Sequence, residues 1–124
     1  ISGCLNNKEK IFYIEKVFEK FYVKGIGVKC VIEEPWITVA ETCEFIIALV
    51  IVGRIKDAER LLIDVFNISD TAGIPYMGWQ YEENIFWPNE RPSWTSSALI
   101  IAADSLYNFS DASDLFVRNQ STFY

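Results

Sequence analysis

Apolar side chains recur at helical spacing along the first part of the chain. Between residues 7 and 23, lysines and glutamates occupy the positions between them. The apolar stripe consists of Ile11, Ile14, Val17, Phe18, Phe21 and Tyr22. This spacing predicts an amphipathic helix, and Gly25 and Gly27 predict its end.

Two further helices are predicted in the middle of the chain. Pro35 suits a first helical position, and residues 36–53 then run to Gly53. The second half of this segment is apolar on every side, which predicts a helix buried all round. Residues 55–68 follow at once with a single apolar stripe, while their charged residues, Asp64 among them, are expected to face water. The two segments together predict an αα-hairpin.

Residues 74–94 interrupt this helical pattern. They contain three of the four tryptophans, and three prolines divide the run. Such a segment predicts a long ordered loop in place of a regular helix, and binding sites often lie on loops of this kind.

A second strongly apolar helix is predicted at 93–107, and Asp111 resembles the N-cap of a last short helix with Leu115 and Phe116 on its inner face. The five helical segments predict an all-α fold. We expect a single domain over residues 1–124, built from antiparallel helical hairpins.

A faint repeat links two of the predicted helix starts. The tetrapeptide from Pro35 to Thr38 precedes one apolar helix, and that from Pro92 to Thr95 precedes the other. Repeats at a fixed separation are typical of stacked or circular helical arrays.

Composition narrows the function. The chain has 124 residues, is 51% hydrophobic and carries a formal charge of −6, so we expect one folded domain that does not bind nucleic acid. The longest apolar tract, Phe45 to Val52, is too short to span a membrane. We expect a cytoplasmic protein without a signal peptide, and the start at Ile1 suggests a processed or partial product.

Cysteine and histidine content bears on metal chemistry. The three cysteines, Cys4, Cys30 and Cys43, lack C-x-x-C spacing, and the chain has no histidine. We therefore expect buried reduced thiols, no metal site, no cofactor and no serine triad.

Several strings occur together in residues 33–108. They are Pro35-Trp36, Gly78-Trp79-Gln80-Tyr81, Phe86-Trp87-Pro88-x-Glu90, Trp94-Thr95-Ser96-Ser97-Ala98 and Ala102-Ala103-Asp104-Ser105-Leu106. In this combination the chain resembles bacterial α/α-toroid proteins that are labelled prenyltransferase-like or squalene-cyclase-like. The resemblance implies inner helices that line a cavity and long loops that cap it, as an incomplete arc of about five helices.

The chain departs from the catalytic members of that group. It lacks a D-x-D-D acid motif and a Q-x-x-x-G-x-W repeat, and it has no histidine to bind the zinc of protein prenyltransferases. Catalysis is therefore unproven. The resemblance implies a ligand-binding module, whose ligand would be an isoprenoid or a carbohydrate.

The aromatic residues at the loop end of the hairpins are the candidate ligand-binding residues. They are Trp36, Trp79, Tyr81, Trp87 and Trp94. An alternative is a packing role for Trp36 and Trp94 in the first turns of buried helices.

Glutamates provide the candidate catalytic pair. Glu41 and Glu90, with tryptophans as flat platforms, suit a carbohydrate-active enzyme of the glycosidase type. The alternative is that these two carboxylates cap helix starts or pair with Arg54 and Arg91. Glu82-Glu83 is expected in a solvated turn.

The preferred function is the toroid-type ligand-binding module, and the glycosidase-like enzyme is the first alternative. A second alternative is a structural hairpin unit that completes a barrel by association, as a homo-oligomer or within a larger parent chain.

Overall fold

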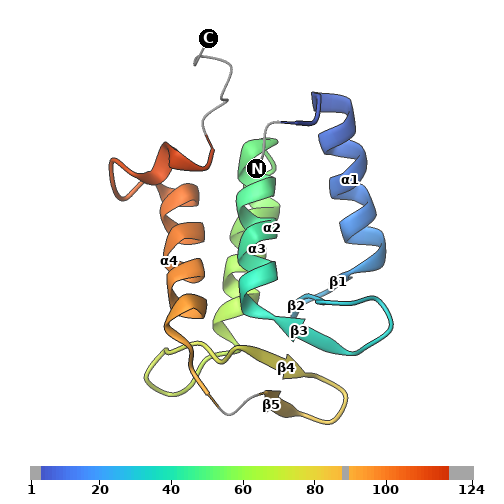
Figure 1. Cartoon of the computed structure of the whole chain (residues 1–124), viewed down its shortest axis with the longest axis vertical. Helices are drawn as coiled ribbons and strands as arrows, with labels where there is room; N and C mark the ends of the chain where they lie inside the picture. Colours follow the sequence, from blue (N-terminus) through green and yellow to red (C-terminus); the bar gives the residue numbers. More distant parts are fainter. Residues whose placement is uncertain (1–3, 88–89, 118–124) are drawn as a thin grey trace.

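The structure is a computed structural model, and it describes residues 4–87 and 90–117. Four α-helices and two antiparallel sheets make up this part of the chain (Figure 1). The elements are α1 (Asn7–Lys20), β1 (Tyr22–Val23), β2 (Gly27–Val28), β3 (Trp36–Thr38), α2 (Val39–Ile51), α3 (Ile55–Phe66), β4 (Gly78–Gln80), β5 (Ile85–Trp87), α4 (Ser93–Tyr107) and the short 3₁₀-helix η1 (Ser113–Leu115). The prediction of an all-α fold of helical hairpins is wrong, because residues expected in helices or loops form five strands in the described part of the chain.

Helix α1 begins with a capping box. The Asn6 side chain accepts from the backbone N–H of Glu9, and the Glu9 carboxylate accepts from the backbone N–H of Asn6. The helix ends at Lys20, earlier than predicted, because the chain then forms the β1–β2 hairpin. Gly25 and Gly27 have φ of +77° and +150°, which a side chain would disfavour, so the hairpin depends on them.

Strand β3 replaces the predicted first turn of a helix. Pro35 precedes this strand, and its carbonyl accepts from the backbone N–H of Tyr81 at 3.2 Å. Trp36 therefore lies in a β-ladder, and helix α2 begins only at Val39. Trp94, in contrast, lies in the first turn of helix α4. The two tetrapeptides therefore begin different kinds of element, and the predicted repeat of helix starts is wrong.

Helix α2 is the centre of the fold, and it packs against both α3 and α4 (Figure 1). Cys43, Ile46 and Leu49 on α2 are completely buried. The predicted αα-hairpin is confirmed, because α2 and α3 are neighbours joined by a short turn at Gly53, where φ is +78°.

Helix α4 is less buried than its sequence predicts. Leu99 and Ala102 face the core, but Ile100 is 68% exposed and Trp94 is 52% exposed. After α4, the N-cap of η1 is Ala112, so the predicted N-cap at Asp111 is wrong. Leu115 is 71% exposed, so the prediction that it lies on the inner face of this helix is wrong as well.

Large apolar side chains are also exposed on α1, where Ile11, Phe12 and Tyr13 are each more than half exposed. Large exposed apolar side chains can form part of an interaction site when they lie side by side. No helix in the described residues has both the length and the apolar character needed to cross a membrane.

Candidate functional site

The strands gather at the end of the molecule where α2 and α4 begin (Figure 1). There β3, β4 and β5 form one antiparallel sheet, in which Ile37 pairs with Trp79 and Trp79 pairs with Phe86. Directly opposed residues share a face of a sheet, and successive residues alternate between faces. Ile37, Trp79 and Phe86 therefore lie on one face, and Trp36, Thr38 and Gln80 on the other.

A cavity of about 360 Å³ lies beside the Trp36 face of this sheet. Its described lining comprises Cys30, Trp36, Thr38, Met77 and Gly78. The backbone of Cys30 is held against β3 by a hydrogen bond from its N–H to the carbonyl of Trp36, at 3.1 Å. The volume is within the range of roughly 300–1,000 Å³ typical of small-molecule sites. We take this cavity as the candidate binding site.

Gly78 is required for the close packing of β4 on β3 beside the cavity. A Cβ atom at this position would lie 2.7 Å from the carbonyl oxygen of Ile37 and 3.4 Å from Cγ2 of Thr38. Glycine therefore allows β4 to approach β3 closely while contributing only backbone to the cavity wall.

Two threonines connect the cavity to helix α2. Thr38 is the N-cap of α2, but its hydroxyl makes no capping hydrogen bond. The Thr38 Oγ1 atom is buried and has no hydrogen-bond partner among the described residues. The carbonyl of Thr38 accepts instead from the hydroxyl of Thr42, at 2.7 Å. The Thr38 hydroxyl is thus a buried group that is closed off from the cavity and whose hydrogen-bonding capacity is unused.

The opposite face of the sheet carries a stack of aromatic rings. The ring centroids of Tyr76 and Phe86 are 4.3 Å apart, and those of Phe86 and Trp79 are 6.0 Å apart. The guanidinium of Arg91 lies over the Tyr76 ring, 5.1 Å from its centroid, and pairs with Asp70 at 2.8 Å. Because these rings pack on one another and on the core, they fix the shape of the sheet.

The β4–β5 turn is closed by side chains of the sheet. Gln80, only 8% exposed, accepts from the backbone N–H of Glu83 at 2.6 Å, and the Trp79 indole N–H donates to Asn84 at 3.1 Å. Glu82 and Glu83 are exposed in this turn, as predicted. The segment predicted as a long loop is therefore partly a β-hairpin.

The structure separates the residues predicted to form one site. Trp36 lines the cavity, whereas Trp79 belongs to the stack on the other face, and Tyr81 is half-buried against the core. Trp94 is exposed on α4. Trp87 pairs with Gly78 through its backbone, and its side chain lies outside the described residues.

Neither predicted catalytic glutamate lines the described part of the cavity. Glu41 is exposed in the first turn of α2, and Glu90 is exposed before α4. The alternative offered ion pairs of these glutamates with Arg54 and Arg91, but in the described residues Arg91 pairs with Asp70, and Arg54 pairs with Glu15 and Asp57. The first-turn position of Glu41 agrees with a helix-stabilising role.

Sequence reasoning missed three cavity residues, Cys30, Thr38 and Met77. Met77 stands directly before the Gly78-Trp79 string, but no motif marks it. Cys30 was expected to be buried and is exposed, as is Cys4, whereas Cys43 is buried as predicted. Cys30 is placed beside the cavity by its backbone hydrogen bond to Trp36 on β3, and the spacing of residues along the sequence does not indicate this pairing.

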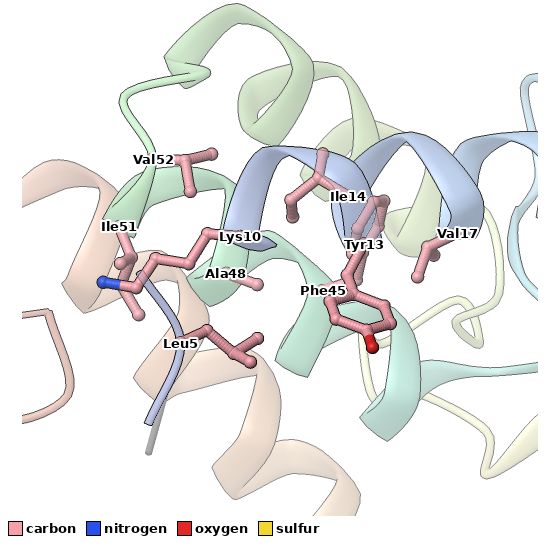
Figure 2. Close-up of a pocket in the computed structure, with 9 residues that line it drawn as sticks. All are labelled: Leu5, Lys10, Tyr13, Ile14, Val17, Phe45, Ala48, Ile51 and Val52. Atoms are coloured by element: carbon pink, nitrogen blue, oxygen red, sulfur yellow. The ribbon is translucent and has the colours of Figure 1, made fainter. Parts of the chain in front are cut away.

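A second hollow lies between α1 and α2 (Figure 2) and has a volume of about 170 Å³. Lys10, Tyr13 and Ile14 of α1 and Phe45, Ala48 and Ile51 of α2 are among its lining residues. Its volume is below the usual range for ligand sites, and its lining is almost wholly apolar. This hollow is less suited to a polar ligand than the cavity beside β3.

The prediction that Asp64 on α3 faces solvent is wrong, because only 8% of its surface is exposed. Burial raises the pKa of Asp64, and the positive charge of Arg60 opposes this shift in part. Buried carboxyls with a raised pKa can act as general acids. Asp64 does not line the cavity beside β3, so we treat it as a structural group.

Comparison with known proteins adds a chemical direction. No family model matches the chain. The chain is 32% identical over 116 residues to a protein named MMP endo-(1,4)-3-O-methyl-alpha-D-mannosidase from Mycolicibacterium hassiacum. The match covers 94% of this chain but 32% of the relative. The relative is named as a mannosidase, so the prediction of a prenyltransferase-like protein is wrong. The resemblance to α/α-toroid proteins in residues 33–108 stays a prediction. Over nearly all its length, the chain is similar to about a third of a protein named as a glycosidase.

Proposed function

We propose that this chain is a carbohydrate-binding segment of a glycosidase that acts on α-mannosides. The observation that carries the proposal is the similarity of nearly the whole chain to part of a named mannosidase. The carbohydrate-active alternative drawn from the sequence agrees with this direction better than the isoprenoid-binding one does.

The cavity beside β3 supports sugar binding. The Trp36 indole in its wall provides a flat apolar surface. Sugars present a matching surface, because the faces of their rings are C–H-rich. Hydrophobic and aromatic side chains are the usual lining of a small-molecule site.

We assign binding, and not bond cleavage, to the cavity. Glycosidases cleave with two carboxyl groups about 5–9.5 Å apart on either side of the scissile bond. The described lining contains no carboxylate, and both Glu41 and Glu90 are exposed outside it. The role of this pair in catalysis remains a prediction.

Calorimetric titration tests the proposal. We expect the chain to bind short α-(1→4)-linked 3-O-methylmannose oligosaccharides at millimolar concentration or below, and not farnesyl diphosphate. Trp36→Ala should weaken sugar binding about tenfold, since an aromatic contact contributes roughly 0.5–1.5 kcal/mol beyond its buried area.

Trp94→Ala is the matched control, because Trp94 is exposed on α4 outside the described cavity lining. Equal loss of affinity in both variants would place the sugar elsewhere. Binding of farnesyl diphosphate alone would favour the isoprenoid module instead.

Association with another protein segment stays a prediction. The exposed apolar residues of α1 and α4 are the surface that such association would use. The chain spans about a third of the relative's length, so in a longer polypeptide these faces would have neighbours.

A further inference from the structure

We propose that two copies of this chain associate through the outer face of helix α4, with the two helices antiparallel. The proposal goes beyond the proposed function and does not depend on sugar binding. Helix α4 lies at one side of the molecule, with α2 and α3 between it and α1 (Figure 1). One face of α4 packs on α2, and the face that points away from α2 is open in the described part of the chain.

The outer face of α4 is a continuous stripe along the helix. Its members are spaced three or four positions apart, which places them on one side of a helix. They are Trp94, Ser97, Ile100, Ile101, Asp104 and Tyr107. The four large apolar members are each more than a third exposed. Steps of three and four along an apolar face are the pattern by which one helix packs against another.

The composition of the stripe is unlike that of a helix face that stays in water. Asp104 is the only charged residue in α4, whereas Lys56 and Arg60 are both exposed on α3. Large apolar side chains with few charges are typical of the buried centre of a protein interface. Because the whole chain has a formal charge of −6, a surface poor in charge is also where two copies repel each other least.

The order of residues along the stripe fits a second copy of the same helix. We place the two-fold axis between Ile100 and Ile101, so that the isoleucines of both copies meet at the centre. Trp94 of one copy then lies at the level of Tyr107 of the other, since both residues are equally far from the centre. A two-fold axis forms each contact twice, so a stripe with this symmetry pairs with itself along its whole length. An unrelated partner segment would not require such symmetry.

The antiparallel arrangement also accommodates the charge of Asp104. Ser97 and Asp104 are equally far from the centre, so each carboxylate lies at the level of a serine hydroxyl of the other copy. Within its own chain, Asp104 accepts from the backbone N–H and the hydroxyl of Ser110, at 2.8 and 2.7 Å. The Ser97 hydroxyl donates to the carbonyl of Ser93 at 2.9 Å and can turn to the carboxylate instead.

The two Asp104 carboxylates do not oppose each other across the interface. They are separated by seven helical positions, about 10 Å along the axis, which exceeds the screening length of about 8 Å at physiological salt. A helix pair with four large side chains from each copy lies at the small end of protein interfaces, near about 1,200 Å², where association is weak and reversible. We therefore expect an equilibrium between monomer and dimer.

Sedimentation of the full chain over a range of concentrations tests the association. The mass should rise from 14.3 kDa towards twice that value as the concentration increases. Ile100→Glu places a charge from each copy at the centre of the interface and should weaken the dimer at least about tenfold, since facing like charges cost several kcal/mol. Ile63→Glu is the control, because Ile63 is 65% exposed on α3, and it should leave the mass unchanged. Circular dichroism checks that both variants are folded.

Cysteine cross-linking tests the antiparallel register. The background carries Cys4→Ser and Cys30→Ser, which removes the exposed native thiols. On mild oxidation Ile100→Cys should form a disulfide between copies, because residues next to the axis come within the Cα separation of about 7 Å that a disulfide allows. Tyr107→Cys should not, since its two copies lie about 20 Å apart along the helix axis.

Three outcomes would overturn the proposal. A single-chain mass at every concentration excludes the dimer and leaves the stripe to a segment of another polypeptide. A dimer that Ile100→Glu does not weaken uses another face, such as the exposed apolar residues of α1. Cross-linking through Tyr107→Cys in place of Ile100→Cys contradicts the antiparallel arrangement centred on the isoleucines.

Discussion

The backbone N–H of Val28 donates a hydrogen bond to the buried hydroxyl of Thr42, at 3.0 Å. The same hydroxyl donates to the carbonyl of Thr38 at 2.7 Å. One completely buried side chain thus joins strand β2 to the start of α2. Because Thr38 also lines the cavity, this contact positions its wall.

Thr42→Val should lower the free energy of unfolding by about 1–3 kcal/mol, because it leaves the buried N–H of Val28 without its acceptor. Urea unfolding followed by circular dichroism measures the change. Thr71→Val, at an exposed turn position, should leave the midpoint nearly unchanged. Equal midpoints for the two variants would contradict the role of Thr42.

Gly78→Ala should destabilise the sheet. The added Cβ would lie 2.7 Å from the carbonyl oxygen of Ile37, so β3 and β4 would have to separate. Overpacking of this kind costs about 1–3 kcal/mol, and we expect a lower melting temperature together with weaker sugar binding. Glu82→Ala, in the exposed turn that follows β4, is the control. Unchanged melting of Gly78→Ala would show that the strands tolerate the extra atom.

Cys43 should resist alkylation in the folded protein. Burial raises the pKa of Cys43 to about 12, and the charges of Glu41 and Glu44 add to this shift. At pH 8 we expect iodoacetamide to modify Cys30 quickly and Cys43 only after unfolding, as shown by peptide mass spectrometry. Rapid native-state modification of Cys43 would contradict its burial.

The raised pKa of Cys43 also predicts how the free energy of unfolding changes at alkaline pH. The thiol pKa is higher in the folded state than its unfolded value of about 8.5. The stability that the protonated thiol contributes is therefore complete below about pH 8.5 and is lost as the pH rises towards about 12. The free energy of unfolding should fall over this window, and by less in Cys43→Ala.

Asp64→Asn should change how stability depends on acidity. Burial raises the pKa of Asp64 in the folded state, so its contribution is complete below the unfolded value of about 3.9 and is lost as the pH rises through the folded value. Relative to the unchanged protein, the variant should gain stability as the pH rises from the unfolded value of about 3.9 through the folded value. A stability difference that stays constant as the pH is raised above about 4, measured by urea unfolding, would contradict the shift.

The hydrophobic pattern alone determined the helical part of the fold. Residues 55–68 predicted a helix that the structure places at Ile55–Phe66, and the apolar run from Phe45 predicted the buried centre of α2. These predictions held because helical periodicity is a local property, set by which side chains within a few turns face the core.

Only the tertiary structure decided the fate of Trp36. Its neighbourhood of Pro35 and Thr38 suits a helix start, but hydrogen bonds to β4, more than 40 residues later, place it in a sheet. Strand pairing joins residues that are distant in sequence, so no local pattern indicated it. The same pairing separates Trp36 from Trp79, because adjacent positions of a ladder alternate between faces. Sequence identified the aromatic residues, and the alternation of the sheet decided which of them lines a cavity.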